Sequence, residues 1–198
     1  MKMKKLTVPD LISIGVFTAL YFVLVTIATF TSAALLPGFS NIFLPAIAAL
    51  ISGCVYMLLV VKIRKFGGIS VMGVVMGMFF LVSGHFILSF AANIVCGIAA
   101  DLIAGHRNYG SKKSVLWSYV IFSYGLIGPV LPMWFMKDAY VANLMDRGKD
   151  TAYIEGLFAH MNLLTFAIAM VSILVCALLG GYFGQKMVRK HFKKAGIV

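Results

Sequence analysis

Charged residues are scarce in this sequence, and acids are the scarcest of them. Only 6 of the 198 residues are Asp or Glu, against 17 Lys or Arg, and charged residues make up 12% of the chain. Soluble domains carry about 25% charged residues, so this composition excludes an ordinary soluble fold. Hydrophobic residues make up 62%, and several runs reach the roughly 20 apolar residues that a membrane-spanning helix needs. The sequence therefore predicts an integral membrane protein.

Motifs for catalysis and for metal binding are also missing. The three cysteines, Cys54, Cys96 and Cys176, stand far apart in apolar runs, so neither a redox pair nor a metal site is expected. The sequence has no GxxxxGK(S/T) segment, which is the phosphate-binding loop of many ATPases. HExxH and GxSxG are absent too. We therefore expect no enzyme activity, no cofactor and no metal.

Six apolar segments predict an all-α bundle that forms one membrane domain over residues 1–198. The predicted spans are 10–35, 42–61, 69–83, 85–104, 115–135 and 162–184, and residues 136–161 form a long outer segment. Residues 69–104 are a nearly continuous apolar run of 36 residues. As a straight helix it would be about 54 Å long, which is too long for one crossing. A tight turn near Gly84 is predicted to divide it.

Basic residues occur mainly in the segments between the predicted spans. The N-terminus has three, the loop after the second span three, the loop after the fourth span three and the C-terminal tail five. Thus 14 of the 17 fall on one side of the six-span arrangement. The positive-inside rule places that side, with both termini, in the cytoplasm. Because this distribution explains the net charge of +11, a nucleic-acid partner is not expected.

The segment 124–140 (YGLIGPVLPMWFMKDAY) breaks the helical pattern inside an apolar run. Its glycines and prolines would interrupt a helix, because each proline removes a backbone donor and clashes with the preceding turn. Non-helical backbone at membrane depth is tolerated only where protein or a water-filled cavity covers it. We therefore interpret this segment as the rim of a cavity at the outer face.

Polar and aromatic side chains near this outer face are candidate ligand contacts, because pockets combine an apolar lining with a few convergent polar groups. The substrate-binding candidates are His85, Asn93, Tyr124, Trp134, Lys137, Asp138 and Asn162. Trp134 would stack on a solute, whereas His85 and Asn93 would hydrogen-bond to it. Lys137 and Asp138 would meet charged groups or close the site. The alternatives are an interfacial anchor for Trp134 and an interhelical hydrogen bond for Asn93.

Small residues recur four positions apart in three of the predicted spans. The pairs are Gly15 and Ala19, Gly73 and Gly77, and Gly180 and Gly184. This spacing lets two helix backbones approach closely. It predicts either packing inside the bundle or a docking face for another membrane subunit.

Two acids lie at the ends of predicted spans. Asp10 follows Thr7 and Pro9 at the start of the first span, a pattern that predicts a helix-capping acid. Asp101 lies one turn from the end of the fourth span, and we expect it to pair with nearby basic residues such as Arg107. A role in proton coupling is the alternative for Asp101.

The segments KKLTVPDLISIGVFTALYFVL, LIGPVLPMWFMKDAYVA and GGYFGQKMVRKHFKKAGIV together resemble the Trep_Strep family of bacterial integral membrane proteins. The likeness covers nearly the whole chain. That family is grouped with the substrate-binding S components of energy-coupling factor (ECF) transporters. The resemblance therefore implies a six-helix protein of the bacterial cell membrane that binds a vitamin, a metal ion or another micronutrient on its outer side.

The same resemblance implies partners, because S components have no ATPase of their own. They dock on a transmembrane coupling subunit that carries two cytoplasmic ATPases, through small residues at AxxxA spacing on the first helix. The matching positions here are Gly15 and Ala19, so glycine replaces the first alanine. No motif matches a vitamin-specific S component closely enough to name the substrate.

Two other functions stay open at this level. One is a stand-alone small-solute carrier driven by an ion gradient through Asp101. The other is a membrane enzyme that acts on lipid, with His85 and Asp138 as acid and base. The lack of a paired-acid or metal motif argues against the enzyme.

Overall fold

A computed structural model of the chain describes residues 5–192, which form helices and turns without a strand. The longer helices are α1 (Val8–Leu35), α2 (Ser40–Ile51), α3 (Gly53–Ile63), α4 (Gly68–Val82), α5 (Leu88–Gly105), α6 (Lys112–Tyr124), α8 (Lys137–Asp146), α9 (Thr151–Phe158) and α10 (Leu163–Met187). Two short pieces, η1 (Gly125–Ile127) and α7 (Pro132–Phe135), connect α6 to α8, and η2 (Val188–Phe192) continues α10. The predicted all-α fold is confirmed. Four predicted inner-side lysines, Lys2, Lys4, Lys193 and Lys194, lie outside the described residues.

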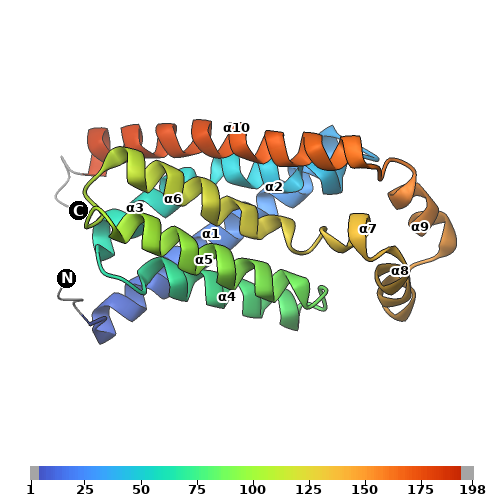
Figure 1. The fold of residues 1–198 in the computed structure, drawn as a ribbon, viewed down its shortest axis with the longest axis horizontal. Coiled ribbons are helices and arrows are strands. Elements are labelled where there is room, and N and C mark those ends of the chain that lie inside the picture. Colours follow the sequence, from blue (N-terminus) through green and yellow to red (C-terminus); the bar gives the residue numbers. More distant parts are fainter. Residues whose placement is uncertain (1–4, 193–198) are drawn as a thin grey trace.

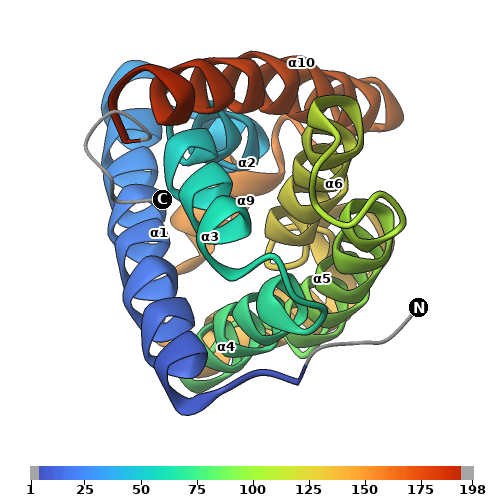
Figure 2. The ribbon, with the colours of Figure 1, turned by 90° about the vertical axis from the view of Figure 1, so that its left-hand side faces the viewer.

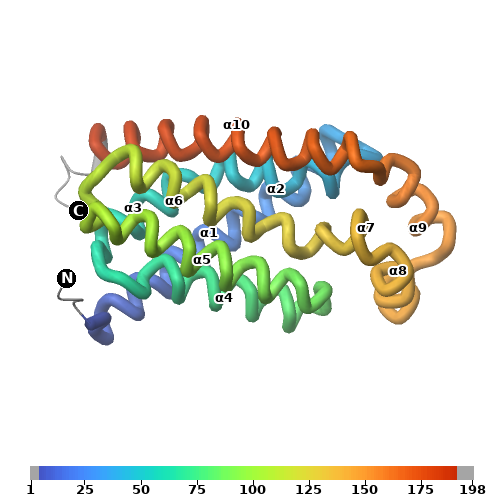
Figure 3. The backbone as a smooth tube through the Cα atoms, viewed as in Figure 1, coloured from blue at the N-terminus to red at the C-terminus, as the bar shows by residue number. Residues whose placement is uncertain are grey.

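The helices run back and forth along one long axis (Figure 1). We call the end at which α1 begins and α10 ends the terminal end. The helices α8 and α9 lie beyond the opposite end, which we call the far end (Figure 3). Seen from the terminal end, α1, α4, α5, α6 and α10 surround α3 (Figure 2). The central position of α3 explains why most of its side chains are buried.

Three helical segments are long and apolar enough to cross a membrane: α1, α5 and residues 163–190, which include α10. The bent pair α2 and α3 makes a fourth if it counts as one span. Two more helices of the bundle are shorter, with 15 residues in α4 and 13 in α6. At 1.5 Å per residue they measure about 22 Å and 20 Å, against a hydrocarbon core of about 30 Å. The described residues thus supply three or four spans by length and composition.

The apolar segments are interrupted at two places, and the sequence predicted one of them. The predicted turn near Gly84 is confirmed: α4 ends at Val82, Gly84 has a φ of +78°, and α5 begins at Leu88. The predicted second span is divided, because α2 and α3 meet at an angle of 48°. At this bend, a Cβ on Gly53 would lie 2.1 Å from the carbonyl oxygen of Gly180 in α10. The missing side chain of Gly53 therefore lets the backbones of α3 and α10 come closer than other residues would allow.

The small-residue pairs divide into two buried ones and one exposed one. A Cβ on Gly73 of α4 would lie 2.7 Å from the carbonyl oxygen of Asn93 in α5, and a Cβ on Gly184 would lie 2.5 Å from that of Gly53. These pairs pack inside the bundle. Gly15 and Ala19 are instead exposed on α1, and a Cβ on Gly15 would have nothing within 4 Å.

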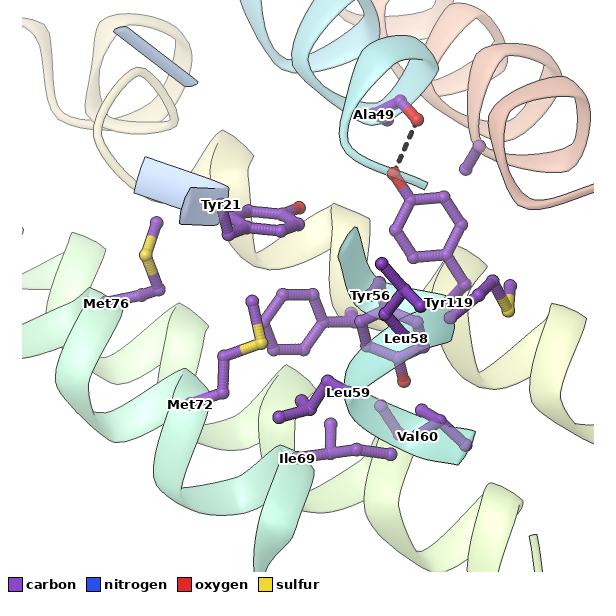
Figure 4. Packing of buried hydrophobic residues seen from close by; sticks show 14 of the residues in the cluster. Tyr21, Ala49, Tyr56, Leu58, Leu59, Val60, Ile69, Met72, Met76 and Tyr119 are labelled. Carbon is purple, nitrogen blue, oxygen red and sulfur yellow. Dashed lines mark hydrogen bonds between the residues drawn. The ribbon is translucent and has the colours of Figure 1, made fainter. Parts of the chain in front are cut away.

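Three buried tyrosines pack in the bundle centre (Figure 4). Tyr21, Tyr56 and Tyr119 come from α1, α3 and α6, and none is exposed. The Tyr119 hydroxyl donates to the carbonyl oxygen of Ala49 at 2.5 Å (Figure 4), and the Tyr56 hydroxyl lies 2.6 Å from Ser118 Oγ. These hydrogen bonds join α6 to α2 and to α3 across the bundle.

The two acids at span ends both stabilise turns. Asp10 caps α1 as predicted: its carboxylate accepts from the backbone N–H and hydroxyl of Thr7, both at 2.7 Å, and pairs with Lys65. The prediction for Asp101 was wrong. Its carboxylate accepts four hydrogen bonds from backbone amides and hydroxyl groups, and within residues 5–192 it accepts none from a basic side chain. The donors are the amides of Gly67 and Ser70, the Ser70 hydroxyl and the Tyr109 hydroxyl, at 2.6–2.9 Å.

Candidate solute-binding site at the far end

The segment predicted to break the fifth span forms the floor of the far end. α6 ends at Tyr124, and residues 125–130, which form the short helix η1 and a turn, are buried. A Cβ on Gly128 would lie 2.8 Å from Ser89 Cα in α5. The Asn93 amide donates to the carbonyl oxygen of Gly125 at 3.1 Å and to that of Ser89 at 2.8 Å. Protein therefore covers this backbone, and Asn93 makes the interhelical hydrogen bond that was one of its two predicted roles.

Residues 136–161, which we call the cap segment, reach two separate turns of the bundle. The His160 ring stacks on Phe39 of the α1–α2 turn, with 4.3 Å between ring centres. Arg147 Nε lies 3.8 Å from the position of a Cβ on Gly84, in the α4–α5 turn. Leu144 of α8 and Ile154 of α9 are buried. The cap segment is thus a folded part of the far end, and α8 is a helix that the sequence analysis did not predict.

A cavity of about 220 Å³ lies between α7, the cap segment and the start of α10. It is lined by Met133, Trp134, Phe135, Lys137, Phe158, Met161, Asn162, Leu163 and Phe166. Lys137 is the charged member of this set, and its Nζ lies 5.1 Å from the centre of the Phe158 ring. Aromatic rings with one cation suit a small solute that is flat, anionic or both.

Three of the sequence candidates meet at this cavity. Trp134 packs edge-on against Phe166, with 5.6 Å between ring centres, and its indole N–H donates to Thr165 Oγ1 at 3.4 Å. Asn162 caps α10, because its side-chain oxygen accepts from the Thr165 amide at 2.9 Å. With Lys137, these residues place stacking, hydrogen-bonding and charged groups around one space.

The other candidates lie outside this cavity. The Tyr124 hydroxyl donates to the carbonyl oxygen of Met170 at 3.0 Å and so ties α6 to α10. Asp138 is exposed in the first turn of α8. Neither of these residues lines the cavity, and neither does Asn93.

His85 lies in the α4–α5 turn, against the edge of Phe80, with 5.4 Å between ring centres. Its Nδ1 is buried without a hydrogen-bond partner among the described residues, as is Oδ1 of Asn143 in α8. Burial lowers the pKa of the His85 imidazole below its ordinary value, and the positive charge of Arg147 adds to this effect. Unpaired buried polar atoms are rare in folded proteins, so each of these two atoms could still accept a hydrogen bond.

Several site residues were missed by the sequence analysis. Phe158 and Phe166 line the cavity as rings in apolar helices, where nothing in the sequence separates them from lipid-facing phenylalanines. Asn143 is one of many polar residues in the cap segment. Only the fold brings Phe158 and Phe166 to the same cavity as Trp134.

The sequence profile of the family described as "Hypothetical bacterial integral membrane protein (Trep_Strep)" matches residues 8–194. The chain belongs to the Trep_Strep family. This match confirms the family resemblance drawn from the three sequence segments. It covers both the exposed Gly15 and Ala19 of α1 and the residues of the far-end cavity. No curated protein and no solved structure matches the chain.

Membership of Trep_Strep explains the exposed apolar side chains of the helices. Phe30 of α1 is 73% exposed, and Leu164 of α10 is 69% exposed. Such residues would be costly in water, but lipid tails accommodate them. The apolar helices and the family together identify a multi-pass integral membrane protein.

Proposed function

We propose that this Trep_Strep protein is the substrate-binding membrane subunit, or S component, of an ECF-type importer in the bacterial cell membrane. It captures a small solute on the outer side, at the far end of the bundle. Partner subunits that hydrolyse ATP then drive uptake. The chain itself catalyses no reaction.

The distribution of charge supports this orientation. The chain crosses the membrane six times, through α1, α2–α3, α4, α5, α6–α7 and α10, and both termini are cytoplasmic. Lys65 pairs with Asp10 at the start of α1, and Gln185 near the end of α10 donates to the carbonyl oxygen of Lys112 at 2.8 Å. The basic turns after α3 and α5 therefore gather at the terminal end, as the positive-inside rule requires of the cytoplasmic side.

The observation that carries the proposal is the far-end cavity under the cap segment. Its volume of about 220 Å³ is below the roughly 300–1,000 Å³ of pockets for drug-sized ligands. The solute is accordingly small. Trp134 offers a ring face or edge, Lys137 attracts an anionic group, and Asn162 stands at the positive N-terminal end of α10.

Tryptophan fluorescence tests capture at this cavity. The chain has two tryptophans, and Trp117→Phe leaves Trp134 as the sole reporter. Native mass spectrometry of the purified protein would first identify a co-purifying solute. Adding that solute should change the Trp134 emission, and Lys137→Gln should weaken its binding by about tenfold, the loss of roughly one charge-assisted contact.

The matched control is Lys149→Gln, because Lys149 is also in the cap segment and lies over an aromatic ring, that of Tyr153, but does not line the cavity. The control should bind like the parent protein. Equal binding by the parent and Lys137→Gln, together with an unchanged Trp134 signal, would place the solute elsewhere and remove the basis of the proposal.

The exposed small-residue pair on α1 supports docking to a coupling subunit. Of the three pairs, the one in α4 already packs against α5, and the one in α10 packs against α2 and α3. Gly15 and Ala19 are instead exposed, and a Cβ on Gly15 would have no neighbour within 4 Å. A flat strip of small residues lets a partner helix approach closely in lipid. We assign this face to the transmembrane subunit that carries the two ATPases.

Gly15→Leu with Ala19→Leu tests the docking face. A Cβ on Gly15 meets nothing within 4 Å, so the larger side chains should leave the isolated chain folded while they hold a partner helix away. We expect the variant to lose co-purifying membrane and ATPase subunits and to retain solute binding. Ala91→Leu, at an exposed alanine of α5, should keep the partners. Full recovery of the partners by the α1 variant would refute this docking face.

The Asp101 contacts favour the ATP-driven importer over a carrier that couples ions through this residue. Its carboxylate receives four hydrogen bonds and holds the start of α4 against the α5–α6 turn. A group that binds and releases protons during transport would have to break them in each cycle. The lipid-enzyme alternative gains no support from the contacts of its two residues, since His85 packs on Phe80 and Asp138 is exposed.

A further inference from the structure

A second cavity lies at the terminal end, between α3, α6 and the last turns of α10. Its volume is about 600 Å³, larger than that of the far-end cavity. Four basic residues line it: Arg64, Lys112, Lys186 and Arg189. They come from three separate parts of the chain, so the fold itself brings their charges together. The proposed transport function does not use this cavity.

No carboxylate of the described residues neutralises the positive charge in this cavity. No described acid lines it. The two acids at this end of the bundle are committed to other groups, Asp10 to Lys65 and Asp101 to four hydrogen bonds. Four like charges around one space repel one another, and an anion between them would relieve that repulsion.

The rest of the lining selects the kind of anion. Below the basic rim the walls are apolar, with Met57, Val60 and Val115 among the lining residues. Tyr182 also lines the cavity and is 66% exposed on α10, so the cavity reaches the outer surface of the bundle. The start of α6, at Ser111 and Lys112, adds the positive end of a helix dipole. A phosphate group with an apolar portion beneath it fits this combination.

We propose that the terminal-end cavity binds a phosphate-bearing anion, with the phosphate held among Arg64, Lys112, Lys186 and Arg189. Basic pockets between helices on the cytoplasmic side of membranes are suited to anionic lipid headgroups. The headgroup of an anionic phospholipid and a soluble phosphate share this chemistry. Binding here would anchor the last turns of α10 to α3 and α6.

The test compares two double variants of the full-length protein that lose the same charge. Lys112→Gln with Arg189→Gln removes two lining residues, whereas Lys113→Gln with Lys190→Gln removes their sequence neighbours, which are exposed and do not line the cavity. Each protein is purified in a neutral detergent and titrated with short-chain phosphatidylglycerol, short-chain phosphatidylcholine and inorganic phosphate. Native mass spectrometry counts the bound molecules.

We expect the parent protein to retain one phosphatidylglycerol, or inorganic phosphate, in preference to phosphatidylcholine. The lining variant should bind it about 30-fold more weakly, since each basic residue near the surface contributes roughly a factor of five to ten. The affinity of the control variant for the same anion should stay within about threefold of that of the parent protein. Retention of phosphatidylglycerol alone identifies the lipid headgroup, and equal competition by inorganic phosphate identifies a soluble phosphate.

Arg64 gives a second, independent variant. Its φ is +45°, in the left-handed region that glycine adopts without strain. Arg64→Gly therefore removes the guanidinium while it keeps the turn, and it should weaken anion binding at unchanged thermal stability. Equal loss of binding in the lining and control variants, or no preference of the parent protein for either anion, would overturn the proposal.

Discussion

The glycines of the small-residue pairs give a prediction whose sign changes with position. A Cβ on Gly180 would lie 2.4 Å from the carbonyl oxygens of both Ala49 and Leu50. Ordinary contact begins at 3.4 Å, so Gly180→Ala requires α10 to withdraw by about 1 Å. Gly15→Ala meets nothing within 4 Å and gains the better helix propensity of alanine.

The expected changes in stability follow from two effects, steric overpacking and the higher helix propensity of alanine. Forcing an extra methyl group against backbone costs about 1–3 kcal/mol, and helix propensity offsets about 0.5–1 kcal/mol of this. We expect Gly180→Ala to lower the free energy of unfolding by about 1–2 kcal/mol, or the Tm by roughly 2–8 °C. Gly15→Ala should raise the Tm by roughly 1–4 °C.

Thermal unfolding of the two purified variants in the same detergent, followed by intrinsic fluorescence, measures both effects. The parent protein and Gly156→Ala serve as references, because a Cβ on Gly156 also meets nothing within 4 Å. A loss of stability in Gly15→Ala as large as that in Gly180→Ala would show that α1 packs through Gly15 in the isolated chain. It would thereby remove the argument for a free docking face.

Three further substitutions test the packing and the cap segment. Tyr119→Phe leaves the buried carbonyl oxygen of Ala49 without its donor and should cost about 1–3 kcal/mol in thermal unfolding; an unchanged Tm would mean that water or another donor replaces the hydroxyl. Asp101→Ala removes the acceptor of four hydrogen bonds, so we expect a loss of about 3 kcal/mol or more, and a loss below about 1 kcal/mol would contradict its structural role. Because the pKa of His85 is lowered in the folded protein, its neutral form is favoured there, and stability present above the unfolded pKa of about 6.5 is lost as the pH falls. Protease cleavage of the cap segment should therefore rise between about pH 7.5 and 5.5, and His85→Gln should flatten that rise; an identical pH profile in the variant would exclude His85 as the cause.

The features that length and backbone chemistry dictate could be predicted from the sequence. The apolar run 69–104 is too long for one crossing, and Gly84 supplies the left-handed turn that divides it. The glycines and prolines after Tyr124 end α6 where expected. Thr7 and Asp10 form the predicted cap, because their hydrogen bonds join residues only three positions apart.

The features that depend on distant contacts could not be predicted. The bend between α2 and α3 occurs where α10 approaches Gly53, and no proline marks the position itself. Asp101 is near Arg107 in the sequence, but the fold gives it Ser70 and Tyr109 instead. The far-end cavity likewise joins Trp134 and Lys137 to Phe166 across the cap segment, a separation that no local pattern spans.

Solute uptake into vesicles tests the proposed role most directly. The purified chain, reconstituted alone into proteoliposomes, should bind the co-purifying solute but should not accumulate it, with or without ATP and with or without a proton or sodium gradient. Native membranes that contain the partner subunits should accumulate the solute when ATP is supplied inside, and Gly15→Leu with Ala19→Leu should abolish that uptake. Accumulation driven by an ion gradient in proteoliposomes that hold this chain alone would contradict the account.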